Sequence, residues 1–141
     1  MLNATELAEE LYELTAWQKT PELLGDSDYL KMVVRGVRRF FRDINHPEEY
    51  DITLWINDNG VLYYDRDFLI DEVEYILILC RTEFFQRVQL DVNNAMSYKT
   101  DALTVSNADK PFANLQNTLN DLDNERRMAF HKMTRYSLGE A

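Results

Sequence analysis

Apolar residues recur at helical spacing over most of the chain, in four separate stretches. Residues three, four and seven positions apart share one face of an α-helix, and each stretch follows that rule. The stretches cover about 4–15, 27–44, 66–94 and 109–136 of the 141 residues. This length suits one domain with one hydrophobic core. We therefore expect a single mainly helical domain over 1–141, with four helices arranged like a bundle.

Two of the predicted helices carry further information. Between Val73 and Cys80 the helix over 66–94 is apolar on almost every side, which is typical of a long central helix. The helix over 27–44 contains Gly36, although glycine destabilises a helix interior by about 1 kcal/mol relative to alanine. We interpret this glycine as a place where a neighbouring element packs closely.

The segment 50–64 breaks the helical period. Apolar and polar residues alternate from Ile52 to Ile56, turn chemistry follows at Asp58-Asn59-Gly60, and VLYY follows at 61–64. This pattern fits either a small β-hairpin or a compact loop with two apolar anchors. A hairpin on its own is marginally stable in water, so it would have to pack against the helices.

A second segment outside the helical pattern, 97–110, lies between the last two helices. Leu103 and Val105 alternate with polar neighbours, as residues of an edge strand do. The segment has too few large apolar side chains to form a core of its own, so its own helices or another chain must cover it. We predict a short β-ribbon that serves in docking or subunit pairing, and the sequence leaves open whether it pairs within or between subunits.

The formal net charge of −10 is unevenly distributed. Residues 1–30 hold seven acids and one base, residues 31–42 hold five bases and no acid, and residues 43–80 hold ten acids and one base. An acidic surface repels duplex DNA. The basic segment is therefore an exception that needs an explanation.

The basic residues of this segment recur at helical spacing. Lys31, Arg35, Arg38 and Arg42 share one face of the predicted helix, and Arg39 lies beside them. Three interpretations are open: a solvated face opposite the apolar one, a contact with the acidic region of a neighbouring copy, and DNA binding by the helix. In the second of these, arginines that face carboxylates would set the register between subunits.

The sequence offers no set of residues for catalysis, so we expect no enzyme, no cofactor and no metal. His46 and His131 lie far apart, and neither has a second ligand at metal spacing. Cys80 is the only cysteine and lies in an apolar helical stretch, where a thiol is more often a core residue than a nucleophile. No run of about 18 apolar residues is present, so no membrane span is expected.

The residues around the predicted ribbon resemble a known family. The long buried helix is followed by SYKTDALTVS at 97–106, by DKPF at 109–112, and by a closing helix that contains NERR at 124–127. This arrangement resembles the small head–tail connector proteins of tailed bacteriophages, which are also called head completion or adaptor proteins. The segment 52–63 has no counterpart in the family.

The resemblance implies a structural ring subunit, commonly one of twelve copies, that is assembled in the host cytoplasm and located in the neck of the virion. Such rings bind the portal protein on one side and the next neck or tail protein on the other. DNA passes through the lumen without specific binding, and acidic walls would let it slide. By position, the resemblance assigns subunit or partner contacts to two groups, Tyr98, Lys99, Leu103 and Val105 in the ribbon and Met133, Arg135, Tyr136 and Leu138 near the C-terminus.

An alternative function follows from the basic helix alone. A small helical regulatory or nucleic-acid-binding module would use residues 27–44 to contact its target. The acidic surface around that helix would oppose such binding.

Overall fold

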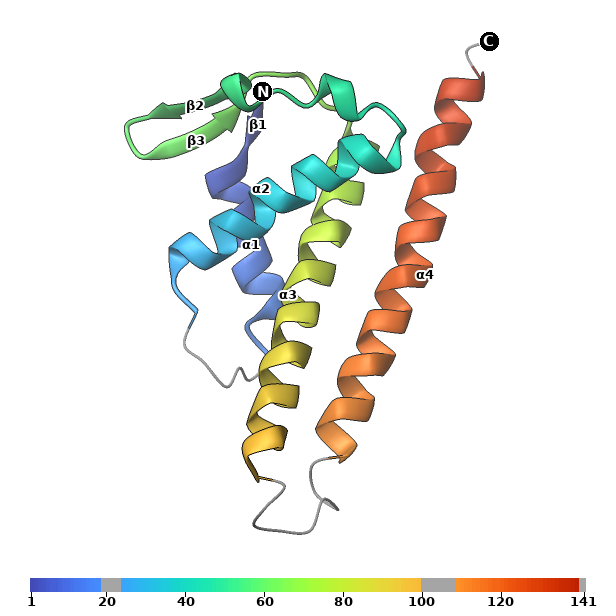
Figure 1. The fold of residues 1–141 in the computed structure, drawn as a ribbon. Helices are drawn as coiled ribbons and strands as arrows, with labels where there is room; N and C mark the ends of the chain where they lie inside the picture. Colours follow the sequence, from blue (N-terminus) through green and yellow to red (C-terminus); the bar gives the residue numbers. More distant parts are fainter. Residues whose placement is uncertain (19–23, 100–108, 140–141) are drawn as a thin grey trace.

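Four helices and a small antiparallel sheet form the described part of the chain in the computed structural model (Figure 1). The structure describes residues 1–18, 24–99 and 109–139, with side chains over 1–18, 24–92 and 114–134. The helices are α1 (Ala4–Thr15), α2 (Asp26–Asp43), α3 (Ile70–Lys99) and α4 (Asp109–Gly139). The strands are β1 (Leu2–Asn3), β2 (Trp55–Asp58) and β3 (Val61–Tyr64), and two 3-10 turns, η1 (Pro47–Glu49) and η2 (Ile52–Leu54), precede the hairpin. The predicted mainly helical fold is confirmed.

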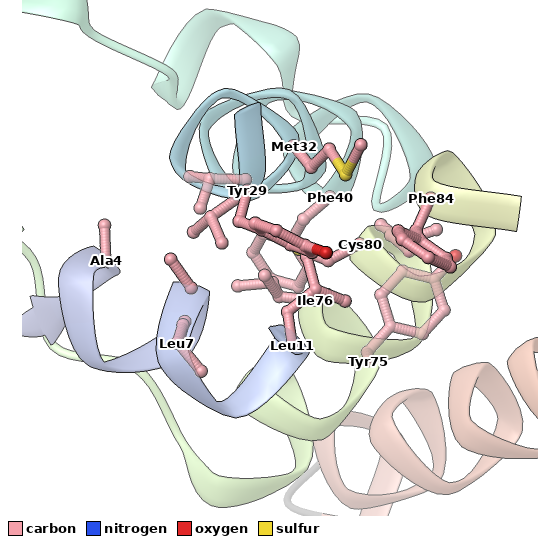
Figure 2. Packing of buried hydrophobic residues seen from close by; sticks show 14 of the residues in the cluster. Ala4, Leu7, Leu11, Tyr29, Met32, Phe40, Tyr75, Ile76, Cys80 and Phe84 are labelled. Atoms are coloured by element: carbon pink, nitrogen blue, oxygen red, sulfur yellow. The ribbon is translucent and has the colours of Figure 1, made fainter. Parts of the chain in front are cut away.

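The long helix α3 is the central element of the fold. It contacts α1, α2 and α4. Figure 1 shows α2 crossing α3 at an angle, while α4 runs beside α3 in the opposite direction. The apolar stretch of α3 supplies Tyr75, Ile76, Leu79 and Cys80 to the core, and all four are fully buried. Figure 2 shows side chains of α1, α2 and α3 meeting in one cluster, among them Leu7, Leu11, Tyr29, Met32, Phe40, Ile76 and Phe84.

Gly36 lies at a close contact between α2 and α3. A Cβ atom at this position would lie 2.6 Å from Sγ of Cys80 and 3.5 Å from the carbonyl oxygen of Ile76. Real Cβ atoms do not approach other heavy atoms so closely, so the helices can pack at this distance only because residue 36 has no side chain. The expected close neighbour is therefore α3.

The segment 50–64 forms a hairpin rather than a loop. Asp58 pairs with Val61 across a two-residue turn in which Asn59 and Gly60 have φ values of 53° and 83°. Positive φ at both positions is the type I′ geometry that Asn-Gly favours, because its twist matches that of the strands. The first strand begins later than the alternation suggests, since Ile52–Leu54 form a 3-10 turn in which Thr53 N–H donates to Asp51 Oδ1 at 2.9 Å.

The N-terminus adds a third strand that the sequence did not indicate. Leu2 and Asn3 pair with Tyr64 and Tyr63, which gives the strand order β1-β3-β2. Asn3 also caps α1, because its Oδ1 accepts a hydrogen bond from Glu6 N–H at 3.0 Å. The start of the chain is thereby fixed to both the sheet and the first helix.

An aromatic cluster centred on Tyr64 joins the hairpin to the helices. Tyr64 is fully buried, and its ring centroid lies between 4.8 and 6.0 Å from those of Trp55, Phe41, Tyr50 and Phe68. Its hydroxyl accepts a hydrogen bond from Asp51 N–H at 3.0 Å. The hairpin thus obtains from the helical core the support that it lacks by itself.

The ends of α3 differ from the prediction. The helix begins at Ile70 rather than Arg66, and the side chain of Glu72 accepts a hydrogen bond from Leu69 N–H at 2.9 Å just before the first turn. At its other end it continues to Lys99. Residues 97–99 of the predicted ribbon, which include Tyr98 and Lys99, therefore belong to the helix, while residues 100–108 lie outside the described residues.

Candidate functional site

Four basic residues form one exposed stripe along α2. Each residue of an α-helix advances by about 100° around the axis, so Lys31, Arg35, Arg38 and Arg42 fall within about 60° of one another. All four residues are exposed, and the opposite side of α2 enters the core through Val33 and other fully buried residues. We call these four residues the basic stripe.

The basic stripe has no ion-pair partner among the described residues. The ion pairs found there use other cations, namely the N-terminus, Arg39, His46, Arg66, Arg81, Arg87, Arg126, Arg127 and Lys132. An exposed, unpaired row of charges adds little to the stability of a single subunit. It is, however, available to a partner of opposite charge.

Arg39 does not share this arrangement. Its side chain is half-buried, and its Nε atom lies 3.8 Å from Oδ2 of Asp43 on the next turn of α2. The same Oδ2 atom accepts a hydrogen bond from the hydroxyl of Tyr75 on α3 at 2.6 Å. Arg39 is thus connected through Asp43 to α3, and it differs in this from the four residues of the stripe.

Tyr75 extends this link to α4. Arg126 of α4 donates from Nε and Nη2 to Oδ1 of Asp123 at 3.2 and 3.1 Å. Its interaction with Tyr75 is the main reason why the pKa of Arg126 is raised. Burial, reinforced by the hydrogen bond to Asp43, raises the pKa of Tyr75 to about 12. One tyrosine therefore connects the three longest helices through charged partners.

Alkaline pH is expected to destabilise the wild-type chain more than a Tyr75→Phe variant. The pKa of Tyr75 lies above its ordinary value of 10, so the folded state holds the phenolic proton more tightly than the unfolded state does. This stabilisation is complete below pH 10 and is lost as the pH rises through 12, a loss of about 2–3 kcal/mol. Urea denaturation across this range should show the additional loss in the wild type alone, and an equal decline in both chains would contradict the assignment.

A groove of about 640 Å³ lies between α1 and α2. Its apolar lining comes from Ala8, Tyr12, Tyr29 and Leu30, and the rings of Tyr12 and Tyr29 meet edge to face with centroids 5.5 Å apart. Its charged lining consists of three exposed carboxylates, with no base, and Gly60 of the hairpin turn borders it. We call it the acidic groove, and its carboxylates are Glu9, Glu13 and Asp26.

The acidic groove was not predicted from the sequence. Glu9, Glu13 and Asp26 are among the seven acids of residues 1–30, but Asp26 belongs to another helix than the two glutamates. A usable signal was present, because Tyr12 lies between two glutamates that are four residues apart and is out of phase with the apolar face of Leu7 and Leu11. No carboxylate of the groove forms an ion pair among the described residues. The acidic groove is therefore unpaired, as the basic stripe is.

The remaining predicted contact residues lie at the ends of α3 and α4. Met133 is half-buried against the core. Arg135, Tyr136 and Leu138 belong to the helical backbone of α4, as Tyr98 and Lys99 belong to that of α3, and their side chains lie outside the described set. Leu103 and Val105 lie outside the described residues altogether.

Side chains that could support chemistry are dispersed in the described part of the chain. Cys80 is fully buried, and burial raises the pKa of its thiol, which disfavours the reactive thiolate. His46 Nδ1 lies 3.2 Å from a carboxylate oxygen of Glu48, and His131 is exposed on α4. Within the described ranges, no three His, Cys, Asp or Glu side chains are grouped as metal ligands would be. No helix there is both long and apolar enough to cross a membrane.

Comparisons of the chain with protein-family models, with curated proteins and with solved structures give no match in any of the three. Its function is therefore inferred from its own residues. The basic stripe and the acidic groove carry opposite charges, and both are exposed on the same small chain.

Proposed function

We propose that this chain is a structural ring subunit of a phage neck, of the head–tail connector type, which joins the portal of the head to the tail and forms part of the DNA channel. One observation carries the proposal: a single chain exposes a basic stripe and an acidic groove, and neither is neutralised among the described residues. Surfaces of opposite charge on one subunit favour contact between copies. When such a contact joins two different surfaces, it generates a ring if the rotation between copies closes.

The order of elements supports the same proposal. A buried central helix, a polar segment and a long closing helix follow one another, and this is the order on which the resemblance to connector proteins rests. Tyr75 of α3 hydrogen-bonds to Asp43 of α2, so the helix that carries the stripe is held against the central helix. A rigid contact surface loses little conformational entropy when it binds.

The overall charge agrees with a channel through which DNA moves. A net charge of −10 disfavours tight, non-specific binding of duplex DNA, which depends on neutralising phosphates with Lys and Arg. If the stripe is covered by a neighbouring copy, the assembled ring presents even fewer free cations to the DNA. The portal protein and the next neck or tail protein are the expected partners.

Electron microscopy of the purified chain mixed with the portal protein of the same phage tests this function. The proposal predicts a closed ring of this chain seated on one end of the portal. A reconstruction of the virion that contains no copy of the chain near the portal vertex would overturn the proposal.

A second function, nucleic-acid binding by α2, is favoured by the exposure of four unpaired cations along one helix. Duplex DNA titrated at two salt concentrations tests it. If the stripe neutralised four phosphates, the logarithm of the affinity would fall with the logarithm of salt concentration with a slope of about −3.6, and Arg38→Glu with Arg42→Glu would remove the binding. The ring proposal predicts no binding by the wild-type chain at physiological salt.

A further inference from the structure

We propose that the acidic groove between α1 and α2 is the docking site for the basic stripe of a second copy of this chain. The inference rests on the proposed function, because it names the two surfaces through which neighbouring subunits of the ring would meet. It assigns a specific occupant to the groove, namely the α2 face that carries Lys31, Arg35, Arg38 and Arg42 of the next copy.

The chemistry of the groove suits arginine in particular. A guanidinium group pairs with a carboxylate through two parallel hydrogen bonds, and it also stacks on aromatic rings. The groove offers both partners, because Tyr12, which is 54% exposed, lines it together with the carboxylates of Glu9 and Glu13. Three of the four residues in the stripe are arginines. The apolar lining of the groove can receive the aliphatic parts of these long side chains.

The spacing of the charges also matches. Glu9 and Glu13 are four residues apart on α1, which corresponds to about 6 Å of helix rise. The stripe repeats the same interval twice, from Lys31 to Arg35 and from Arg38 to Arg42. Two helices that lie roughly parallel or antiparallel can therefore place two cations of the stripe opposite two carboxylates of the groove at the same time.

The two surfaces do not satisfy each other within one chain. The stripe lies on an exposed face of α2, where Lys31 and Arg35 border a hollow shared with Glu83 of α3. The groove lies along the side of α2 that faces α1 and is lined there by Leu30. No ion pair among the described residues joins a cation of the stripe to a carboxylate of the groove. Each copy therefore offers one basic and one acidic surface to its neighbours.

Charge reversal of each surface, followed by mixing, tests this pairing. The groove variant carries Glu9→Lys and Glu13→Lys, and the stripe variant carries Arg38→Glu and Arg42→Glu. The wild-type chain should self-associate at low salt, and each variant alone should associate about tenfold or more weakly, because like charges then face each other. An equimolar mixture should regain the association of the wild type, since every contact between unlike variants again joins opposite charges. Sedimentation velocity measures all four samples.

A matched control distinguishes the effect of charges in the groove from the effect of the net charge of the chain. Asp65→Lys with Asp121→Lys makes the same change in net charge at two exposed carboxylates outside the groove, and this variant should associate like the wild type. The Debye length shortens as salt is added, to about 10 Å at 0.1 M, so the attraction between the exposed charges of two copies is screened more strongly and the association of the wild type should weaken.

Three results would overturn the pairing: a wild-type chain that stays monomeric at low salt, a reversed variant that associates like the wild type, and a mixture of the two variants that stays dissociated. Other results would contradict the proposed function without contradicting the pairing, or the reverse. Association that is restored in the mixture but ends in a dimer or an open filament contradicts the ring and leaves the pairing of the two surfaces in place. Rings on the portal that tolerate both reversals overturn the pairing and leave the ring subunit in place.

Discussion

Replacing Gly36 with valine is expected to lower the free energy of unfolding by about 3 kcal/mol. The first carbon of any side chain at this position would lie 2.6 Å from Sγ of Cys80 and 3.5 Å from the backbone nitrogen of the same residue. Valine adds two methyl groups to a site where not even that carbon fits, so α2 and α3 would have to move apart. Urea denaturation followed by circular dichroism measures the loss.

A double-mutant cycle identifies the contact responsible. Gly36→Ala is expected to destabilise by only about 1 kcal/mol, because the better helix propensity of alanine, about 1 kcal/mol, offsets part of the overlap. In a Cys80→Ala background the nearest atom is gone, and the same substitution should become neutral or stabilising. A cycle in which the two substitutions are additive would contradict a direct contact between these side chains.

Replacing Tyr64 with alanine is expected to destabilise the chain by about 4 kcal/mol. The Tyr64 ring is fully buried and contacts four other rings, which come from α2, the hairpin and the segments beside it. Among the described residues, Tyr64 is the one fully buried side chain of β3. Its removal therefore leaves a cavity where β3 packs against this aromatic cluster. Thermal or urea denaturation gives the size of the effect.

Tyr64→Phe is the matched control for this prediction. It keeps the ring and removes the hydroxyl that accepts a hydrogen bond from Asp51 N–H, so a loss of about 1 kcal/mol is expected. Hydrogen exchange should show faster exchange of the β2 and β3 amides in the alanine variant and near wild-type exchange in the phenylalanine variant. Equal effects of the two substitutions would contradict the central role of the ring.

Features governed by local sequence were predicted well. The period of apolar residues gave α1 with the bounds that the structure shows, Ala4–Thr15, and gave α2 within one residue at each end. The Asn59-Gly60 turn and the close packing at Gly36 were also indicated by single residues, because each requires a conformation or a clearance that few other residues allow.

Features that depend on distant parts of the chain were not predicted. β1 is a pair of residues, too short for any alternation, and it exists because β3 is available to pair with it. The helix predicted over 66–94 begins only at Ile70, because Phe68 packs instead in the aromatic cluster around Tyr64. In both cases tertiary contacts decide between local alternatives.

The candidate site shows the same division. Helical spacing was enough to place the four residues of the basic stripe on one face, because a single helix carries them all. Helical spacing did not distinguish Arg39 from them. Arg39 pairs with Asp43, and Asp43 accepts a hydrogen bond from Tyr75, which comes from another helix. The acidic groove is formed jointly by α1, α2 and the hairpin turn, so no single stretch of sequence contains it.

A reconstruction of the assembled oligomer by electron microscopy tests the central claim most directly. We expect a closed ring in which Arg38 and Arg42 of each copy lie against Glu9 and Glu13 of the next, with Tyr12 covered by the contact. A chain that forms no oligomer, or a ring in which the basic stripe and the acidic groove both face solvent, would contradict the account.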